Sequence, residues 1–100
     1  MPDERHLATG EYLFREGESA AFGYVIKSGR VVIVKSGLDG ERILVELGPG
    51  SLFGELALID GSPRSASARA QEESVVTEIT SEKFNDYIRT NPSAARRIME

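Results

Sequence analysis

Short apolar runs separated by glycine-containing turns fill the first two thirds of the chain. Such runs, apolar or alternating with polar residues and bounded by turn residues, are typical of β-strands. The glycine between the runs at 24–26 and 31–34 predicts a hairpin, and residues 36–40 predict a second turn. Strands are predicted at residues 12–14, 24–26, 31–34, 43–45, 65–70 and 75–79, with a further strand ending at Phe53.

The spacing of these strands favours an antiparallel sandwich or roll. Parallel neighbours need a crossover of a dozen or more residues, usually a helix. The first 50 residues contain no segment that could form one. The chain is therefore predicted to be mainly β.

The pattern changes to a helical period near residue 81. Phe84, Tyr87 and Ile88 lie at i, i+3 and i+4, which is one face of a helix over 81–89 that Thr80 or Ser81 can cap. Asn91 and Pro92 suit the start of a second helix. Its apolar stripe would contain Ala94, Ala95, Ile98 and Met99. Both stripes are interpreted as core packing.

The composition of the chain limits the classes of function that it can have. One hundred residues predict one domain, and a net charge of −4 gives no basic face for nucleic acid. Without cysteine there is neither a disulfide nor a thiolate metal site. No apolar run approaches the ~20 residues that cross a bilayer, and the charged N-terminus does not resemble a signal peptide. A cytoplasmic protein without membrane insertion is expected.

Enzyme chemistry is not expected. The single histidine, His6, lies near a terminus expected to be frayed, so neither a histidine-rich metal site nor a hydrolytic triad can be assembled. We therefore predict no catalytic residue, no metal and no cofactor.

The chemistry is concentrated between Phe53 and Ala66. Gly54 allows close backbone approach, and the free N–H groups at the start of a short helix over 55–59 attract anions. After the turn at 60–63, Arg64 can return beside that helix start and bind a phosphate through two parallel hydrogen bonds. Ser65 can add a hydroxyl, and Ala66 is small enough for its N–H to come close.

Glu55 would repel a phosphate unless the ligand also offers a hydroxyl, such as a ribose 2′-OH. A compact ligand with one phosphate charge and one free ribose hydroxyl would suit Glu55 and Arg64 together. Taken singly, Glu55 can be a helix-dipole partner and Arg64 a surface charge.

Residues 53–66 resemble the phosphate-binding cassette of the cyclic-nucleotide-binding domain family, which includes catabolite-activator-type regulators, regulatory subunits of cAMP-dependent kinase and cyclic-nucleotide-gated channels. Residues 10–18, 24–31 and 47–55 resemble the family's first strand, its glycine-turn hairpin and the approach to the cassette. The matching cassette positions are Gly54, Glu55, Leu56, Ala57, Leu58, Pro63, Arg64, Ser65 and Ala66.

The resemblance implies an antiparallel β-roll (a double-stranded β-helix, jelly-roll-like) with a short helix in the cassette and C-terminal helices. It implies a single domain over 1–100, with the roll over about 7–80, a helical region over 81–100 and most of the family's lid helix missing. We therefore expect a fragment, an excised domain or a minimal single-domain member.

The resemblance also assigns roles. Arg64 is expected to pair with the cyclic phosphate, helped by Ser65 and the Ala66 N–H. Glu55 is expected to accept from the ribose 2′-OH, and Gly54 to let the sugar approach. The apolar surface near the base is assigned to Ile33, Leu44, Val45 and Leu56, for which plain core packing is the alternative.

The expected ligand is a cyclic purine mononucleotide, cAMP before cGMP, because family members that prefer cGMP often have threonine where this chain has Ser65. Ligand binding is expected to reposition the C-terminal helices of a regulatory sensor whose effector is unidentified. The alternative is a β-roll of the same family that binds no ligand and serves a structural or dimerising role.

Overall fold

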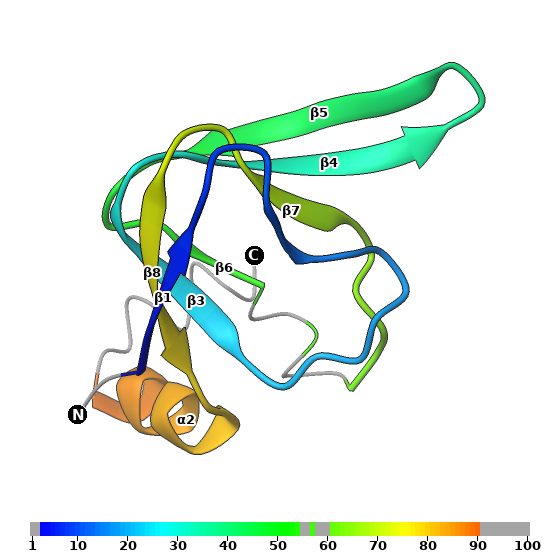
Figure 1. Cartoon of the computed structure of the whole chain (residues 1–100). Helices are drawn as coiled ribbons and strands as arrows, with labels where there is room; N and C mark the ends of the chain where they lie inside the picture. Colours follow the sequence, from blue (N-terminus) through cyan, green and yellow to red (C-terminus); the bar gives the residue numbers. More distant parts are fainter. Residues whose placement is uncertain (1–2, 55–56, 58–60, 91–100) are drawn as a thin grey trace.

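The computed structural model of the chain describes residues 3–54, 57 and 61–90, without the side chains of residues 87 and 88 (Figure 1). Two four-stranded antiparallel sheets, ordered β1-β8-β3-β6 and β2-β7-β4-β5, enclose the core. The elements are β1 (Asp3–Leu7), β2 (Tyr12–Phe14), β3 (Gly23–Ser28), β4 (Val31–Gly37), β5 (Gly40–Leu47), β6 (Leu52–Phe53), β7 (Ser67–Ala70), β8 (Ser74–Ile79) and the helix α2 (Ser81–Thr90). The predicted antiparallel β-roll is confirmed.

Each predicted strand corresponds to an observed one, but the hairpin predicted between 24–26 and 31–34 is wrong. β3 pairs with β8 and β6, whereas β4 pairs with β5 and β7, so the chain changes sheets between them. The change occurs at Gly29, whose φ is +92° and which packs against Ser74. The Ser74 hydroxyl accepts from the Arg30 N–H at 3.0 Å. The short glycine turn thus forms a corner between the sheets.

Strand β1 was not among the predicted strands, and the frayed terminus expected around His6 is wrong. His6 lies in β1 opposite Val75 of β8. Only Leu7 of this strand is buried, as is typical of an edge strand with charged residues. Lys27 Nζ on β3 donates to Glu4 Oε2 at 2.5 Å, and this hydrogen bond lowers the pKa of the exposed Glu4 carboxyl.

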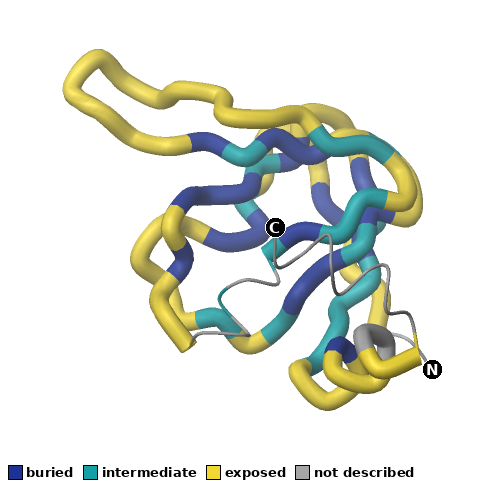
Figure 2. The backbone as a smooth tube through the Cα atoms, turned by 180° about the vertical axis from the view of Figure 1, so that it is seen from behind, coloured by how far each residue is buried: buried dark blue, intermediate teal, exposed yellow. Residues whose placement is uncertain are grey.

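The core lies between the two sheets, where Figure 2 shows the buried residues of facing strands. Aromatic rings fill its centre: Phe14 and Tyr24 stack with centroids 5.9 Å apart, and Tyr24 and Phe53 with centroids 5.6 Å apart. The buried cluster contains Leu7, Leu13, Phe14, Tyr24, Ile26, Val31, Phe53, Ala68, Ala70 and Val76.

Helix α2 lies at one end of the β1-β8-β3-β6 sheet (Figure 1). Of the two predicted caps, Thr80 is the one observed: its hydroxyl accepts from the Lys83 N–H at 3.2 Å. Phe84 is 1% exposed, as the predicted apolar stripe requires. The side chains of Tyr87 and Ile88 lie outside the described residues. The predicted second helix from Pro92 also lies outside the described residues. Of the predicted cassette helix, the structure describes Ala57 alone.

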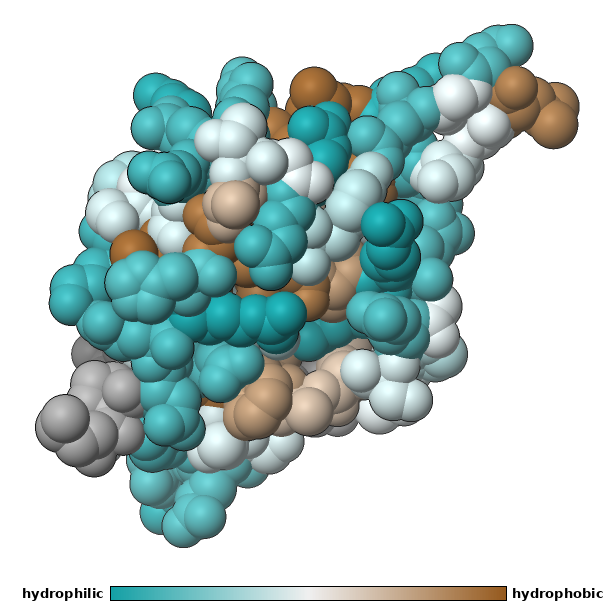
Figure 3. Space-filling view, viewed as in Figure 1, coloured by the Kyte–Doolittle hydropathy of each residue, from teal (hydrophilic) through white to brown (hydrophobic). Residues whose placement is uncertain are grey.

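The β4–β5 hairpin projects from the body of the domain (Figure 1), and β5 is the outer strand of its sheet. Ile33 pairs with Val45 and Val34 with Ile43, so Leu44 is the extra residue of a β-bulge. Figure 3 shows apolar surface at the projecting end, where Leu38 is fully exposed.

Candidate ligand-binding site

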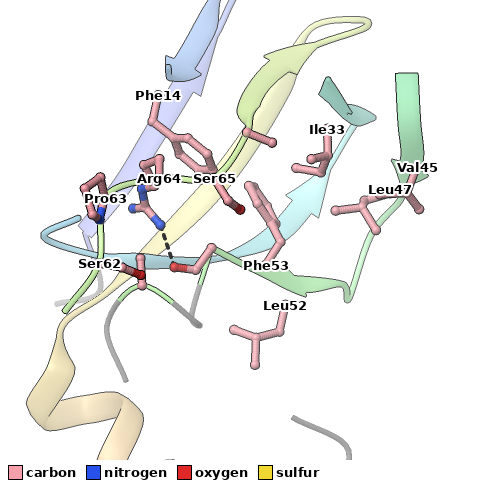
Figure 4. A pocket seen from close by; sticks show the side chains of 13 residues that line it. Phe14, Ile33, Val45, Leu47, Leu52, Phe53, Ser62, Pro63, Arg64 and Ser65 are labelled. Atoms are coloured by element: carbon pink, nitrogen blue, oxygen red, sulfur yellow. Dashed lines mark hydrogen bonds between the residues drawn. The ribbon is translucent and has the colours of Figure 1, made fainter. Parts of the chain in front are cut away.

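A cavity of about 400 Å³ opens between β4–β5, β6 and the segment that precedes β7 (Figure 4). Six of the nine residues predicted for the site line it: Gly54, Arg64, Ser65, Ala66, Ile33 and Val45. The lining residues that were not predicted for the site are Phe14, Leu47, Leu52, Phe53, Ala57, Ser62 and Pro63. Phe14, Leu52 and Phe53 lie in predicted strands, but the apolar pattern alone does not separate a cavity wall from core.

Gly54 lies where the strand β6 ends, with φ +75°. A Cβ at this position would lie 2.9 Å from Arg64 Nη1, 3.4 Å from a Phe14 ring carbon and 3.5 Å from a Tyr24 ring carbon. The family resemblance predicted that a sugar would make the close approach at Gly54. In the structure, the group that makes a close approach there is the Arg64 guanidinium.

Arg64 is a buried cation, 5% exposed, so the surface-charge interpretation is wrong. Its Nη1 donates to the Gly54 carbonyl at 2.5 Å, shown dashed in Figure 4, and its Nη2 donates to the Phe22 carbonyl at 2.6 Å. The guanidinium carbon lies 4.0 Å from the centre of the Phe14 ring. Burying a charge is costly unless polar partners surround it, and these carbonyls together with the aromatic face supply that environment.

The backbone of Arg64 is fixed as well. Its N–H donates to the Glu18 carbonyl, and its own carbonyl accepts from the Gly17 N–H, both at 2.8 Å. The turn after β2 therefore holds the main chain that carries the arginine.

Tyr24 forms part of the same environment. Burial raises the pKa of its phenol, and the positive charge of the neighbouring Arg64 acts in the opposite direction. The phenol is neutral at physiological pH, so Arg64 has no counter-charge from it.

Ser65 and Ala66 follow Arg64 on the cavity wall. Ser65 is exposed, whereas Ala66 is buried. The Ser65 carbonyl accepts a hydrogen bond from Lys35 Nζ at 2.6 Å. The Ala66 N–H has no hydrogen-bond partner in the described part of the chain. It is thus available to a ligand oxygen.

The apolar wall is formed by Ile33 and Val45, which oppose each other across β4 and β5, and by Leu47. Leu44 does not line the cavity. The bulge takes it out of the cross-strand alternation, and it is 53% exposed beside the hairpin residues Lys35 and Arg42. Glu55 and Leu56, the two other predicted site residues, lie outside the described residues.

Among the described residues, no helix has the length and hydrophobicity that a membrane span requires. The histidine, aspartate and glutamate side chains in this part of the chain form no group of three that could hold a metal ion.

A β-roll whose apolar cavity is lined at one point by a buried arginine is typical of modules that bind a small anionic molecule. The profile of the cyclic nucleotide-binding domain family matches residues 4–91 of the chain. The chain therefore belongs to the cyclic-nucleotide-binding domain family.

Sequence and structural similarity to known proteins supports this family assignment. The cyclic AMP receptor protein of Thermus thermophilus is 38% identical over 90 residues, which cover 89% of this chain and 42% of that protein. The crystal structure of the catabolite activator protein of the same organism superposes with a TM-score of 0.84 at 35% identity, covering 98% of this chain and 46% of that one.

The EAL enzyme Bd1971 is similar in both its cAMP-bound and its cGMP-bound forms. The TM-scores are 0.82 and 0.83, at 32% identity, covering 97% of this chain and 26% of the enzyme. The chain spans less than half the length of the curated relatives it matches: 15% of one relative and 42% of another.

Proposed function

We propose that the chain binds cAMP as a regulatory sensor module, with cGMP as a weaker ligand. The observation that carries this proposal is the buried Arg64 at one end of an apolar cavity, within the cassette sequence typical of the family. The cavity volume of about 400 Å³ lies within the range of small-ligand sites.

The described side chains suit the two halves of a cyclic nucleotide. A cyclic phosphate carries one negative charge, and Arg64 offers it charge-assisted hydrogen bonds in a site from which water is partly excluded. The Ala66 N–H and the Ser65 hydroxyl are further donors on the same wall. The purine would lie against Ile33, Val45 and Leu47, whose side chains are apolar. Glu55 is proposed to accept from the ribose 2′-OH.

The preference for cAMP rests on Ser65, because family members that prefer cGMP often have threonine at this position. Bd1971 is described with either nucleotide bound, so the fold accommodates both in that protein. We propose the same two ligands here, in the order cAMP before cGMP, with no catalysis, no cofactor and a cytoplasmic location.

We propose that binding repositions the C-terminal helices. Leu52 supports this proposal because it lines both the ligand cavity and a second cavity of about 370 Å³ beside α2. The second cavity is also bounded by Val25, Ile79 and the buried Phe84. A ligand that moves Leu52 would change the packing of Phe84 and shift the population of α2 positions.

The test is a calorimetric titration with cAMP and with cGMP. One-site binding is expected, and Arg64→Ala is expected to weaken it by at least about 100-fold, since each hydrogen bond to a charged group contributes about 1.5–3 kcal/mol. Arg64→Lys, which keeps the charge but loses the two-pronged geometry, is expected to give an intermediate affinity. Thermal melts establish that each variant folds.

Arg69→Gln is the matched control. Arg69 lies on β7 and pairs with Glu41 at 3.1 Å, away from the cavity lining. Its loss is expected to leave the cAMP affinity within about two-fold. No heat change with the parent chain would contradict the proposal and favour a β-roll that binds no ligand.

A further inference from the structure

Lys35 links three segments around the candidate site. Its Nζ donates to the Ser65 carbonyl at 2.6 Å and lies 3.3 Å from Glu16 Oε2. Lys35 belongs to β4, Glu16 to the turn after β2, and Ser65 directly follows Arg64. The side chains of Lys35 and Glu16 are 48% and 39% exposed, so solvent screens their ion pair.

Lys35 lies on the cavity side of β4. Side chains alternate along a strand, so Lys35 shares a face with Ile33, which lines the cavity. Arg42 opposes Lys35 across the hairpin. Beyond the apolar wall, the same face of the sheet therefore carries two positively charged residues. Their direct opposition across the two strands is electrostatically unfavourable.

The Ser65 carbonyl and the Ala66 N–H belong to one peptide group. The described chain contains no cis peptide bond, and in a trans peptide the C=O and the N–H point in opposite directions. The group that holds the carbonyl consequently sets the direction of the N–H. Lys35 holds this carbonyl, and the Ala66 N–H has no hydrogen-bond partner among the described residues.

We infer that Lys35 is a positioning residue for anion binding: it orients the Ser65–Ala66 peptide so that the Ala66 N–H is available beside Arg64. The inference rests on the proposed function for its ligand, a cyclic phosphate. Glu16 lies 3.3 Å from the same ammonium group and thus favours the position from which it contacts Ser65. Lys35 acts through the peptide and needs no contact with the ligand.

The test compares Lys35→Met with Lys35→Arg, and with Lys27→Met as the control for loss of an exposed strand lysine that pairs with a glutamate. The first measurement is the amide resonance of Ala66 and the carbonyl resonance of Ser65 in the ligand-free protein. Lys35→Met is expected to shift both, Lys35→Arg to restore them in part, and Lys27→Met to leave them unchanged.

The second measurement is cAMP affinity by calorimetry. Lys35→Met is expected to weaken binding about ten-fold, the size of one hydrogen bond to a charged group, with partial rescue in Lys35→Arg. Unchanged Ser65 and Ala66 resonances in Lys35→Met would overturn the inference, whatever the affinity. Shifted resonances with an affinity within two-fold of the parent would overturn it as well. If the parent binds no cAMP, the proposed function fails, and the resonances alone decide whether Lys35 sets this peptide.

Discussion

Gly54→Ala is expected to destabilise the domain moderately and to weaken ligand binding. An L-residue in the left-handed region costs about 1–2 kcal/mol, and Gly54 has φ +75°. The new methyl group would also lie 2.9 Å from Arg64 Nη1, which is the far end of a flexible side chain and can move away. The contacts to Phe14 and Tyr24, at 3.4 Å and 3.5 Å, are ordinary. Backbone strain alone therefore costs about 1–2 kcal/mol and lowers the melting temperature by roughly 4–16 °C, and displacement of the buried Arg64 adds to this loss.

The effect on binding comes from Arg64. Moving Nη1 breaks its 2.5 Å hydrogen bond to the Gly54 carbonyl, so the guanidinium is no longer held in one position. We expect cAMP affinity to fall about ten-fold, as for loss of one charge-assisted hydrogen bond.

Gly10→Ala provides the control for this prediction. Gly10 has φ +85°, and a Cβ there would meet nothing within 4 Å. Gly10→Ala should therefore lower the melting temperature through backbone strain alone, by less than Gly54→Ala does, with unchanged affinity. Thermal melts and calorimetry on both variants separate backbone strain from displacement of Arg64. If Gly54→Ala binds cAMP as tightly as Gly10→Ala, the fixed position of Arg64 has no part in affinity and the reasoning is refuted.

Three further predictions concern stability. Gly29→Ala should lower the free energy of unfolding, measured in urea, by about 2–5 kcal/mol. The new Cβ would lie 2.5 Å from the Glu73 carbonyl oxygen and 2.6 Å from Ser74 Cα, and these backbone atoms cannot move freely. A loss equal to that of Gly10→Ala would contradict the close packing of the Gly29 turn between the two sheets. Phe84→Ala should cost about 3–5 kcal/mol and speed amide exchange throughout α2; unchanged exchange would show that Phe84 does not anchor the helix. The hydrogen bond to Glu41 raises the pKa of Tyr12. The contribution of this hydrogen bond to stability is therefore fully present below the unfolded tyrosine pKa near 10 and is lost as pH rises through the higher folded value. Glu41→Gln should lower the Tyr12 pKa in an ultraviolet titration and remove that alkaline loss; an unchanged pKa would contradict it.

The strands could be predicted because each is a local pattern of apolar residues between turns. The sheets to which they belong could not. Residues 24–26 and 31–34 are consecutive apolar runs, but the pairing of β3 with β8 depends on residues about fifty positions away. β1 was missed for a different reason: an edge strand that buries only Leu7 carries no alternating pattern.

For the site too, the residues could be predicted from local sequence, but their contacts with distant residues could not. The cassette sequence indicated Arg64, Gly54, Ser65 and Ala66, and the structure brings them to one cavity. The group that Arg64 contacts through Nη2 is the Phe22 carbonyl, and a backbone acceptor 42 positions away leaves no trace in residue types. The bulge likewise could not be inferred, so Leu44 was assigned to the wall in place of Leu47.

The bulge at Leu44 also determines which changes of length the hairpin can tolerate. In β5 the odd-numbered Val45 and Leu47 line the cavity, whereas beyond the bulge, nearer the turn, the even-numbered Arg42 is the residue that pairs with Lys35. Removing one residue at the bulge would restore regular pairing with β4 without turning Val45 or Leu47 away from the cavity, because both keep their partners on β4. Homologous chains could therefore differ by one residue in β5 while the wall of the ligand site stays in place.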